Sequence, residues 1–200
     1  MNGAVFIETR DTPGLAAKFE AHLKFVPDLQ PLVICSEQNK YQFNGFEKVV
    51  IKPINNIIEY NFMMTSTQFW DLIPFEKILT CEHESGILRE GLDEFIEWDY
   101  VGAPWWFQKY GGNGGFSWRS VKAMKDICKA YSYTGKGQED TYFCNVMNQS
   151  KYFRLAPRKV CERFSVETVY KLGSFGYHFG KDAKLMLRPW EMDKILQQYD

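Results

Sequence analysis

Two glutamates, two residues apart, follow a short apolar stretch in the middle of the chain. The apolar stretch spans 77–81, and Glu82, His83 and Glu84 come directly after it. If 77–81 is a strand of an open α/β sheet, these carboxylates lie beyond its carboxyl end, where ligands collect in such sheets. Carboxylates in that place bind hard divalent cations that bridge a diphosphate. Glu82 and Glu84 are therefore candidate metal ligands, with His83 pointing away from them. A solvated acidic turn is the alternative.

Four glycines occupy five positions at 111–115, directly before a predicted helix at 117–130. Glycine lets a ligand approach the main chain closely and leaves amides free to bind oxygen atoms. The spacing is neither the dinucleotide fingerprint nor a P-loop. A ligand-binding loop and a plain flexible loop both fit this pattern.

Two acidic residues, Glu139 and Asp140, begin a predicted helix at 139–147. Acidic side chains at this position stabilise the helix dipole and cap free amides. If the start of the helix points into a cleft, one of them can instead act as a base on an acceptor hydroxyl.

A histidine and a lysine, His178 and Lys181, lie among three glycines near the end of the chain. Histidine is a suitable ligand for manganese, and lysine meets phosphate as a point charge. A structural histidine is the alternative. Trp105 belongs to an aromatic group at 98–107, which either stacks on sugar rings beside a cleft or packs in the core.

The elements that must position these residues alternate between short apolar runs and longer amphipathic runs. This order favours an α/β fold with a central, mostly parallel sheet flanked by helices on both faces. The predicted strands are 4–8, 32–35, 48–51, 77–81 and 100–101. The predicted helices are 13–25, 56–70, 91–98, 117–130, 139–147, 157–164 and 188–200.

Length and composition limit the choice of function. The 200 residues suit one domain, 1–200, and the 24 basic against 25 acidic residues give no overall attraction to nucleic acid. No stretch reaches the roughly 18 apolar residues of a membrane span, and the start lacks a secretory signal. We therefore expect a soluble, cytoplasmic protein. Its five cysteines contain no C-x-x-C pair, which argues against a disulfide framework.

Taken in order, the motifs resemble a family of small GT-A-type glycosyltransferases with a Rossmann-like domain. The family includes bacterial domains of unexplored function and enzymes with which large DNA viruses glycosylate their capsids. The markers are VFIETR at 5–10, EYN at 59–61, FW at 69–70, ESGILR at 84–89, DYVGAPW at 99–105, GNGGFS at 112–117, ED at 139–140, FSVE at 164–167 and FGYH at 175–178.

The resemblance implies a metal-dependent hexosyltransferase that uses a UDP-sugar and a glycan, glycoprotein or other hydroxyl acceptor, in the host cytoplasm if the protein is viral. It implies Mn²⁺ or Mg²⁺ as the cofactor. The implied site residues are Glu84, His178 and Glu82 for the metal, Thr9, Arg10 and Lys181 for the nucleotide, Asn113, Gly114, Gly115 and Trp105 for the donor or acceptor, and Asp140, then Glu139, for catalysis.

One position departs from the family pattern, which has aspartate where this chain has Glu84. This departure leaves open a second interpretation, a catalytically degenerate nucleotide- or carbohydrate-binding domain of the same fold. A metal-dependent nuclease using Glu82, Glu84, Asp99 and His178 is disfavoured by the balanced charge. Retaining and inverting enzymes share these parts, so the stereochemistry, the donor sugar and the oligomeric state stay open.

Overall fold

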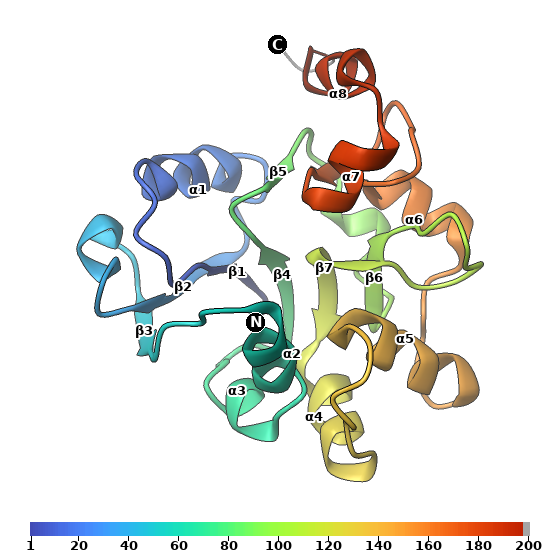
Figure 1. Ribbon diagram of the computed structural model, residues 1–200, viewed down its shortest axis with the longest axis horizontal. Coiled ribbons are helices and arrows are strands. Elements are labelled where there is room, and N and C mark those ends of the chain that lie inside the picture. The colour runs from blue at the N-terminus through green and yellow to red at the C-terminus, as the bar shows by residue number, and fades with distance from the viewer. Residues whose placement is uncertain (198–200) are drawn as a thin grey trace.

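A six-stranded mixed sheet forms the centre of the computed structural model, which describes residues 1–197 (Figure 1). The strand order is β3–β2–β1–β4–β7–β6. β1 to β4 run parallel to one another, whereas β7 runs antiparallel to both β4 and β6. The strands of this sheet are β1 (Gly3–Ile7), β2 (Gln30–Ser36), β3 (Lys48–Ile51), β4 (Lys77–Cys81), β6 (Tyr100–Ala103) and β7 (Asn113–Ser120).

Helices cover both faces of this sheet. Successive residues of β1 point to opposite faces and all of them are buried, as expected for a central parallel strand. One face packs against α1 (Leu15–Leu23) and α6 (Arg158–Phe164). The other face packs against α2 (Ile57–Met64), α3 (Thr67–Asp71), α4 (Val121–Ala130) and α5 (Glu139–Gln149). Two short 3₁₀ helices span Lys40–Phe43 and Leu92–Glu94.

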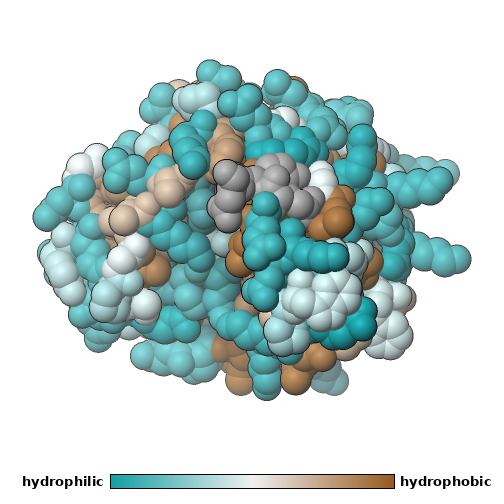
Figure 2. Space-filling model, turned by 90° about the horizontal axis from the view of Figure 1, so that it is seen from above, coloured by the Kyte–Doolittle hydropathy of each residue, from teal (hydrophilic) through white to brown (hydrophobic). Residues whose placement is uncertain are grey.

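A second, three-stranded sheet lies beyond the carboxyl end of β4. Its strands, in the order β5–β9–β8, are β5 (Ser85–Ile87), β9 (Gly176–His178) and β8 (Ser165–Val166). The last helices, α7 (Lys181–Met186) and α8 (Pro189–Leu196), lie next to this sheet and share a small apolar core with it (Figure 1). Figure 2 looks down on this end, where most of the visible surface is hydrophilic. No helix within residues 1–197 is long and apolar enough to cross a membrane.

The predicted α/β class, with its mostly parallel sheet and helices on both faces, is confirmed. The strand at 77–81 is found with the predicted bounds, and the predicted helix at 139–147 continues to Gln149. The predicted helix at 56–70 is two helices, because the Ser66 side chain caps a new start at α3. The predicted C-terminal helix is found as α8, and residues 198–200 lie outside the described part of the chain.

The prediction for 111–130 is wrong in its first half. Residues 113–120 form β7, the strand that inserts between β4 and β6, and the helix begins only at Val121. Glycine disfavours strands on its own, so local propensity argues against this assignment. Pairing of residues 117–119 with both β4 and β6, together with burial of Phe116 and Trp118, outweighs that preference.

A buried arginine joins β7 to α5. The fully buried guanidinium of Arg119 donates to both carboxylate oxygens of Glu139, at 2.7 and 2.8 Å. It lies 5.0 Å from the ring centre of Tyr100 and also donates to the carbonyl of Gly114. These contacts hold the first turn of α5 against the glycine end of β7.

We expect Arg119→Met to destabilise the protein by about 3–5 kcal/mol, because it leaves the Glu139 carboxylate buried without its partner. The double variant with Glu139→Gln should recover part of this loss, since no unpaired charge then remains. Urea denaturation of the wild type, the two single variants and the double variant measures the effect. A double variant that loses the sum of both single losses would contradict a specific ion pair.

Candidate active site

Two adjoining cavities open at the carboxyl ends of the parallel strands. The first, about 300 Å³, is lined by residues that follow β1, β3 and β4. The second, about 740 Å³, lies between β7, the start of α5, β9 and α7. Ile57, Tyr60 and Glu82 line both cavities and form the boundary between them. The site is therefore a divided cleft, with Glu82 at the division.

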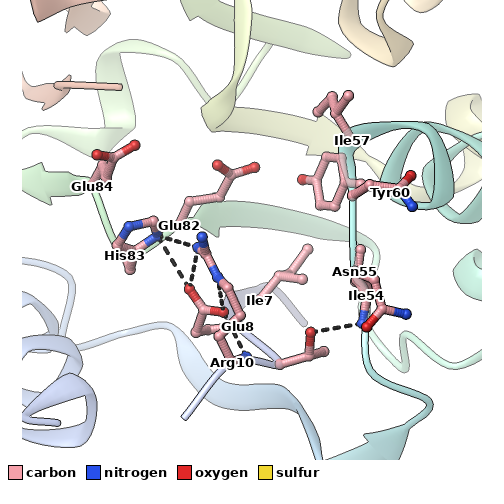
Figure 3. A pocket seen from close by; sticks show the side chains of 12 residues that line it. Ile7, Glu8, Arg10, Ile54, Asn55, Ile57, Tyr60, Glu82, His83 and Glu84 are labelled. Atoms are coloured by element: carbon pink, nitrogen blue, oxygen red, sulfur yellow. Dashed lines mark hydrogen bonds and ion pairs between the residues drawn. The ribbon is translucent and has the colours of Figure 1, made fainter. Parts of the chain in front are cut away.

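A buried carboxylate organises the first cavity. Glu8 accepts two hydrogen bonds from the Arg10 guanidinium, at 2.9 and 2.7 Å, and one from the Arg10 backbone N–H. The ring of His83 lies 3.1 Å from the same carboxylate (Figure 3). Burial raises the pKa of Glu8, but the hydrogen bonds from His83 and Arg10 outweigh it and set the pKa at about 2. Glu8 is therefore a permanent anion that fixes Arg10.

Thr9 and Arg10, the predicted nucleotide residues, both line this first cavity. Thr9 is buried, and its hydroxyl accepts a hydrogen bond from the backbone N–H of Ile54, which fastens the segment after β3 to β1. Asn39 donates to the carbonyls of Glu8 and Arg10, at 2.8 and 2.9 Å. The strand end that carries Arg10 is thus held from two sides.

The acidic segment after β4 is a tight turn. The Ser85 backbone N–H donates to the carbonyl of Glu82, which closes the turn. His83 is turned toward Glu8 and Arg10, whereas the carboxylates of Glu82 and Glu84 point elsewhere (Figure 3). The Glu84 carboxylate is bound by Lys184 of α7 at 2.5 Å. The two glutamates therefore have different partners.

His178 lies between two carboxylates. Its Nδ1 is 3.2 Å from Glu167 Oε1, and its Nε2 is 3.5 Å from Glu82 Oε2. Within residues 1–197 the buried Nε2 makes no hydrogen bond. Burial lowers the pKa of His178, but Glu167 and Glu82 outweigh it and raise the pKa to about 10, so a cation that binds Nε2 must displace a proton. The sequence did not identify Glu167 as a site residue, although it ends the FSVE marker.

The surroundings of His178 fit a divalent cation. A metal-bound histidine commonly has its second nitrogen held by a carboxylate, as Glu167 holds Nδ1, and this leaves Nε2 directed toward Glu82. Residues 1–197 contain no group of three or more His, Cys, Asp or Glu side chains placed to hold a metal. Mg²⁺ and similar ions are commonly held by one or two protein ligands together with substrate phosphates and water. Two protein ligands are therefore compatible with a metal that arrives with a diphosphate.

The glycines of β7 allow both functional groups to approach the strand. A Cβ on Gly115 would lie 2.4 Å from His178 Nε2, and a Cβ on Gly114 would lie 2.2 Å from Glu139 Oε1. The Asn113 side chain accepts a hydrogen bond from the Gly115 N–H and lines the second cavity. The predicted glycine loop is therefore a strand, but its residues do border a cavity.

Asp140 is the buried carboxylate of the second cavity that has no cationic partner among the ion pairs of the described residues. It accepts hydrogen bonds from the backbone N–H groups of Gly114 and Thr141, at 3.0 and 2.6 Å. Burial and the neighbouring charge of Glu139 raise the pKa of Asp140 to about 7. A carboxylate with such a pKa can accept a proton near neutral pH. Glu139, the second predicted catalytic residue, is instead held in the ion pair with Arg119.

The remaining predicted residues also border the second cavity. Lys181 begins α7 at its edge, and Trp105 lines it with the ring stacked on Phe107, 5.7 Å between centres. The fold thus brings Glu82, Glu84, Trp105, Asn113, Gly115, Glu139, Asp140, His178 and Lys181 around one divided cleft, whereas Gly114 is buried and lines neither cavity. Sequence reasoning missed Glu8, Asn39, His83 and Glu167, whose roles depend on contacts between distant segments.

The family comparison covers most of the chain. Residues 40–178 match the model of a family described as "Protein of unknown function (DUF5672)". The chain belongs to the DUF5672 family. A comparison with curated proteins gives no match. The DUF5672 match includes Glu82, Asp140 and His178, and it starts after Thr9 and Arg10.

Solved structures resemble this DUF5672 protein in fold. A galactosyltransferase, LgtC, in complex with donor and acceptor sugar analogs, has a TM-score of 0.56 at 11% identity, over 98% of this chain and 94% of LgtC. HddC from Yersinia pseudotuberculosis has a TM-score of 0.53 at 12% identity, over the full length of both chains. The apo glycosyltransferase GlyE from Streptococcus pneumoniae TIGR4 has 0.50 at 12% identity, over 84% of this chain and 46% of GlyE. The fold is therefore that of GT-A glycosyltransferases.

We expect Asp140→Asn to stabilise the protein more at pH 8 than at pH 5. Asp140 has a pKa near 3.8 in the unfolded chain and about 7 in the folded protein. The free energy of unfolding therefore decreases as the pH rises between these two values, and the full loss is reached above about 7. Asparagine removes this ionisation. Urea denaturation at both pH values measures the difference, and the exposed Asp28→Asn serves as control. An equal effect of Asp140→Asn at both pH values would refute the raised pKa.

Proposed function

We propose that the protein is a metal-dependent glycosyltransferase that moves a hexose-type sugar from a UDP-sugar to a hydroxyl acceptor. The observation that carries this proposal is the placement of Asp140 and the Glu82–His178 pair on one cavity, at the ligand-binding end of a GT-A fold. One group is suited to take a proton, and the other pair is suited to hold a cation. A metal-dependent transfer that activates the acceptor hydroxyl with a base uses both.

The two cavities suit the two halves of a nucleotide sugar. We assign the UDP to the first cavity, where Thr9 and Arg10 lie, and the sugar and acceptor to the second, where Asp140 lies. The diphosphate would then cross the division at Glu82. Lys181, at the edge of the second cavity, supplies a positive charge for it.

Glu82 and His178 would hold Mn²⁺ or Mg²⁺, with Glu167 orienting the histidine. Of the three predicted metal ligands, Glu84 is left out of this proposal, because its carboxylate is engaged by Lys184. A cation bound there neutralises the charge that develops on the departing diphosphate.

Asp140 performs the proton transfer in this proposal. Its carboxylate accepts the proton of the acceptor hydroxyl while the acceptor oxygen bonds to the anomeric carbon. The bond from the anomeric carbon to the diphosphate breaks, and UDP leaves with that electron pair. Backbone N–H groups of Gly114 and Thr141 hold the carboxylate in place. The adjacent ion pair of Glu139 with Arg119 fixes the helix end that carries it.

The reaction is tested by incubating the protein with a panel of UDP-sugars, Mn²⁺ and mixed hydroxyl acceptors, and measuring UDP release. We expect release with at least one donor, and kcat/KM should rise with pH and level off above about 7, because Asp140 must be ionised. Asp140→Asn should lower kcat by at least about 100-fold. UDP binding without release from any donor would instead identify a degenerate binding domain.

Metal-ligand assignment is tested by calorimetric titration of UDP with and without Mn²⁺. Glu82→Gln and His178→Gln should each abolish the increase in UDP affinity that Mn²⁺ gives, because each removes one protein ligand. Glu84→Gln should keep that increase, since its carboxylate is paired with Lys184. Thermal unfolding of each variant controls for loss of fold. If Glu84→Gln loses the Mn²⁺ effect and Glu82→Gln keeps it, the assignment is wrong.

A further inference from the structure

The second cavity has buried polar groups at its bottom and a group of exposed apolar side chains at its mouth. Asp140, Glu167 and His178 are all buried. Five apolar side chains that line the same cavity are largely exposed: Leu185 is 72% exposed, Trp106 64%, and Ile57, Phe107 and Met186 are 55%, 55% and 52% exposed. The charged Lys181 and Asp182 are exposed at the same opening.

The exposed apolar side chains are concentrated at this mouth. Ten large apolar side chains within residues 1–197 are more than half exposed, and five of them line this one cavity. Scattered exposed apolar residues are ordinary, but a contiguous group beside a cleft marks a binding site. The exposed apolar side chains are therefore concentrated at this cavity and are not spread evenly over the surface.

Both sides of the mouth are anchored to the rest of the protein. On one side, the guanidinium of Arg158 donates to the carbonyls of Trp105, Trp106 and Gln108, at 3.1, 3.4 and 3.2 Å. On the other side, α7 is fixed by the ion pair of Lys184 with Glu84 and by the buried Ala183. The apolar side chains are thus presented from fixed backbone and are ready to receive a ligand.

We propose that the acceptor is amphipathic: a hydroxylated head group, such as a sugar, linked to an aliphatic chain. The proposal rests on the proposed function, because it places the head group at Asp140. Leu185, Met186 and Ile57 have neither a hydrogen-bonding group nor a π face for a sugar ring, so an aliphatic chain matches them better than a further sugar does. Burying that chain against them supplies the affinity.

The test compares matched pairs of methyl and octyl glycosides of common hexoses, below the micelle concentration, by direct calorimetric binding in the presence of UDP and Mn²⁺. We expect the better octyl glycosides to bind at least about tenfold more tightly than their methyl partners. Leu185→Gln and Met186→Gln should each reduce this octyl-to-methyl ratio several-fold. Ile58→Gln, a neighbouring residue that is 61% exposed but lines neither cavity, should leave it unchanged.

Equal affinity for octyl and methyl glycosides, or an equal loss of the ratio in the Ile58→Gln control, overturns the proposal. A wild-type dimer that Leu185→Gln converts to a monomer, without any octyl preference, also overturns it, because the mouth would then be an interface between two copies. Binding does not require turnover. An octyl preference without sugar transfer to any glycoside therefore supports the apolar mouth while it argues against the transferase reaction.

Discussion

The close approach of side chains to the glycine end of β7 is the constraint on which the site depends. Asp140 and the Glu139–Arg119 pair lie against Gly114, and His178 lies against Gly115. A methyl group on either glycine would overlap these groups. Both glycines lie in an irregular part of β7, where the register with β6 jumps from Ser117 to Asn113 and the pairing with β4 has not yet begun. Glycine in a strand commonly marks such an irregularity or a close approach of other groups.

Four carboxylates beside this strand have different roles because their surroundings differ. Glu139 is neutralised by a buried guanidinium, and Glu82 and Glu167 lie on opposite sides of one imidazole. Asp140 accepts hydrogen bonds from two backbone N–H groups and from the Thr141 hydroxyl, and burial beside a second acid raises its pKa to about 7. When two neighbouring acids have different surroundings, their pKa values differ. One acid can then stay ionised as a fixed charge while the other serves as a base.

The cleft also separates charge from apolar surface. In the first cavity Glu8 fixes Arg10, so that its guanidinium is held in place before any anion arrives. In the second cavity Asp140, Glu167 and His178 are buried, and exposed apolar side chains lie at the opening beside the charged Lys181. Glu82 lies at the boundary and contributes to both. A ligand with a charged part, a hydroxylated part and an apolar part would meet a matching surface in each region.

The α/β class could be predicted from the order of short apolar and longer amphipathic runs, because each run reflects the burial of one strand or helix. Glu82, Asp140 and His178 could also be recognised as chemically capable residues, from their positions next to a strand, a helix start and glycines. Which of them come into contact depends on the tertiary fold. The pairing of β5 with β9 puts Ser85 opposite His178, so Glu82 faces the histidine and α7 brings Lys184 to Glu84. Likewise, glycines at 111–115 signal a loop locally, whereas pairing with β4 and β6 makes 113–120 a strand. Contacts between segments far apart in the chain leave no periodic pattern in the sequence, so the partners of each carboxylate became known only from the fold.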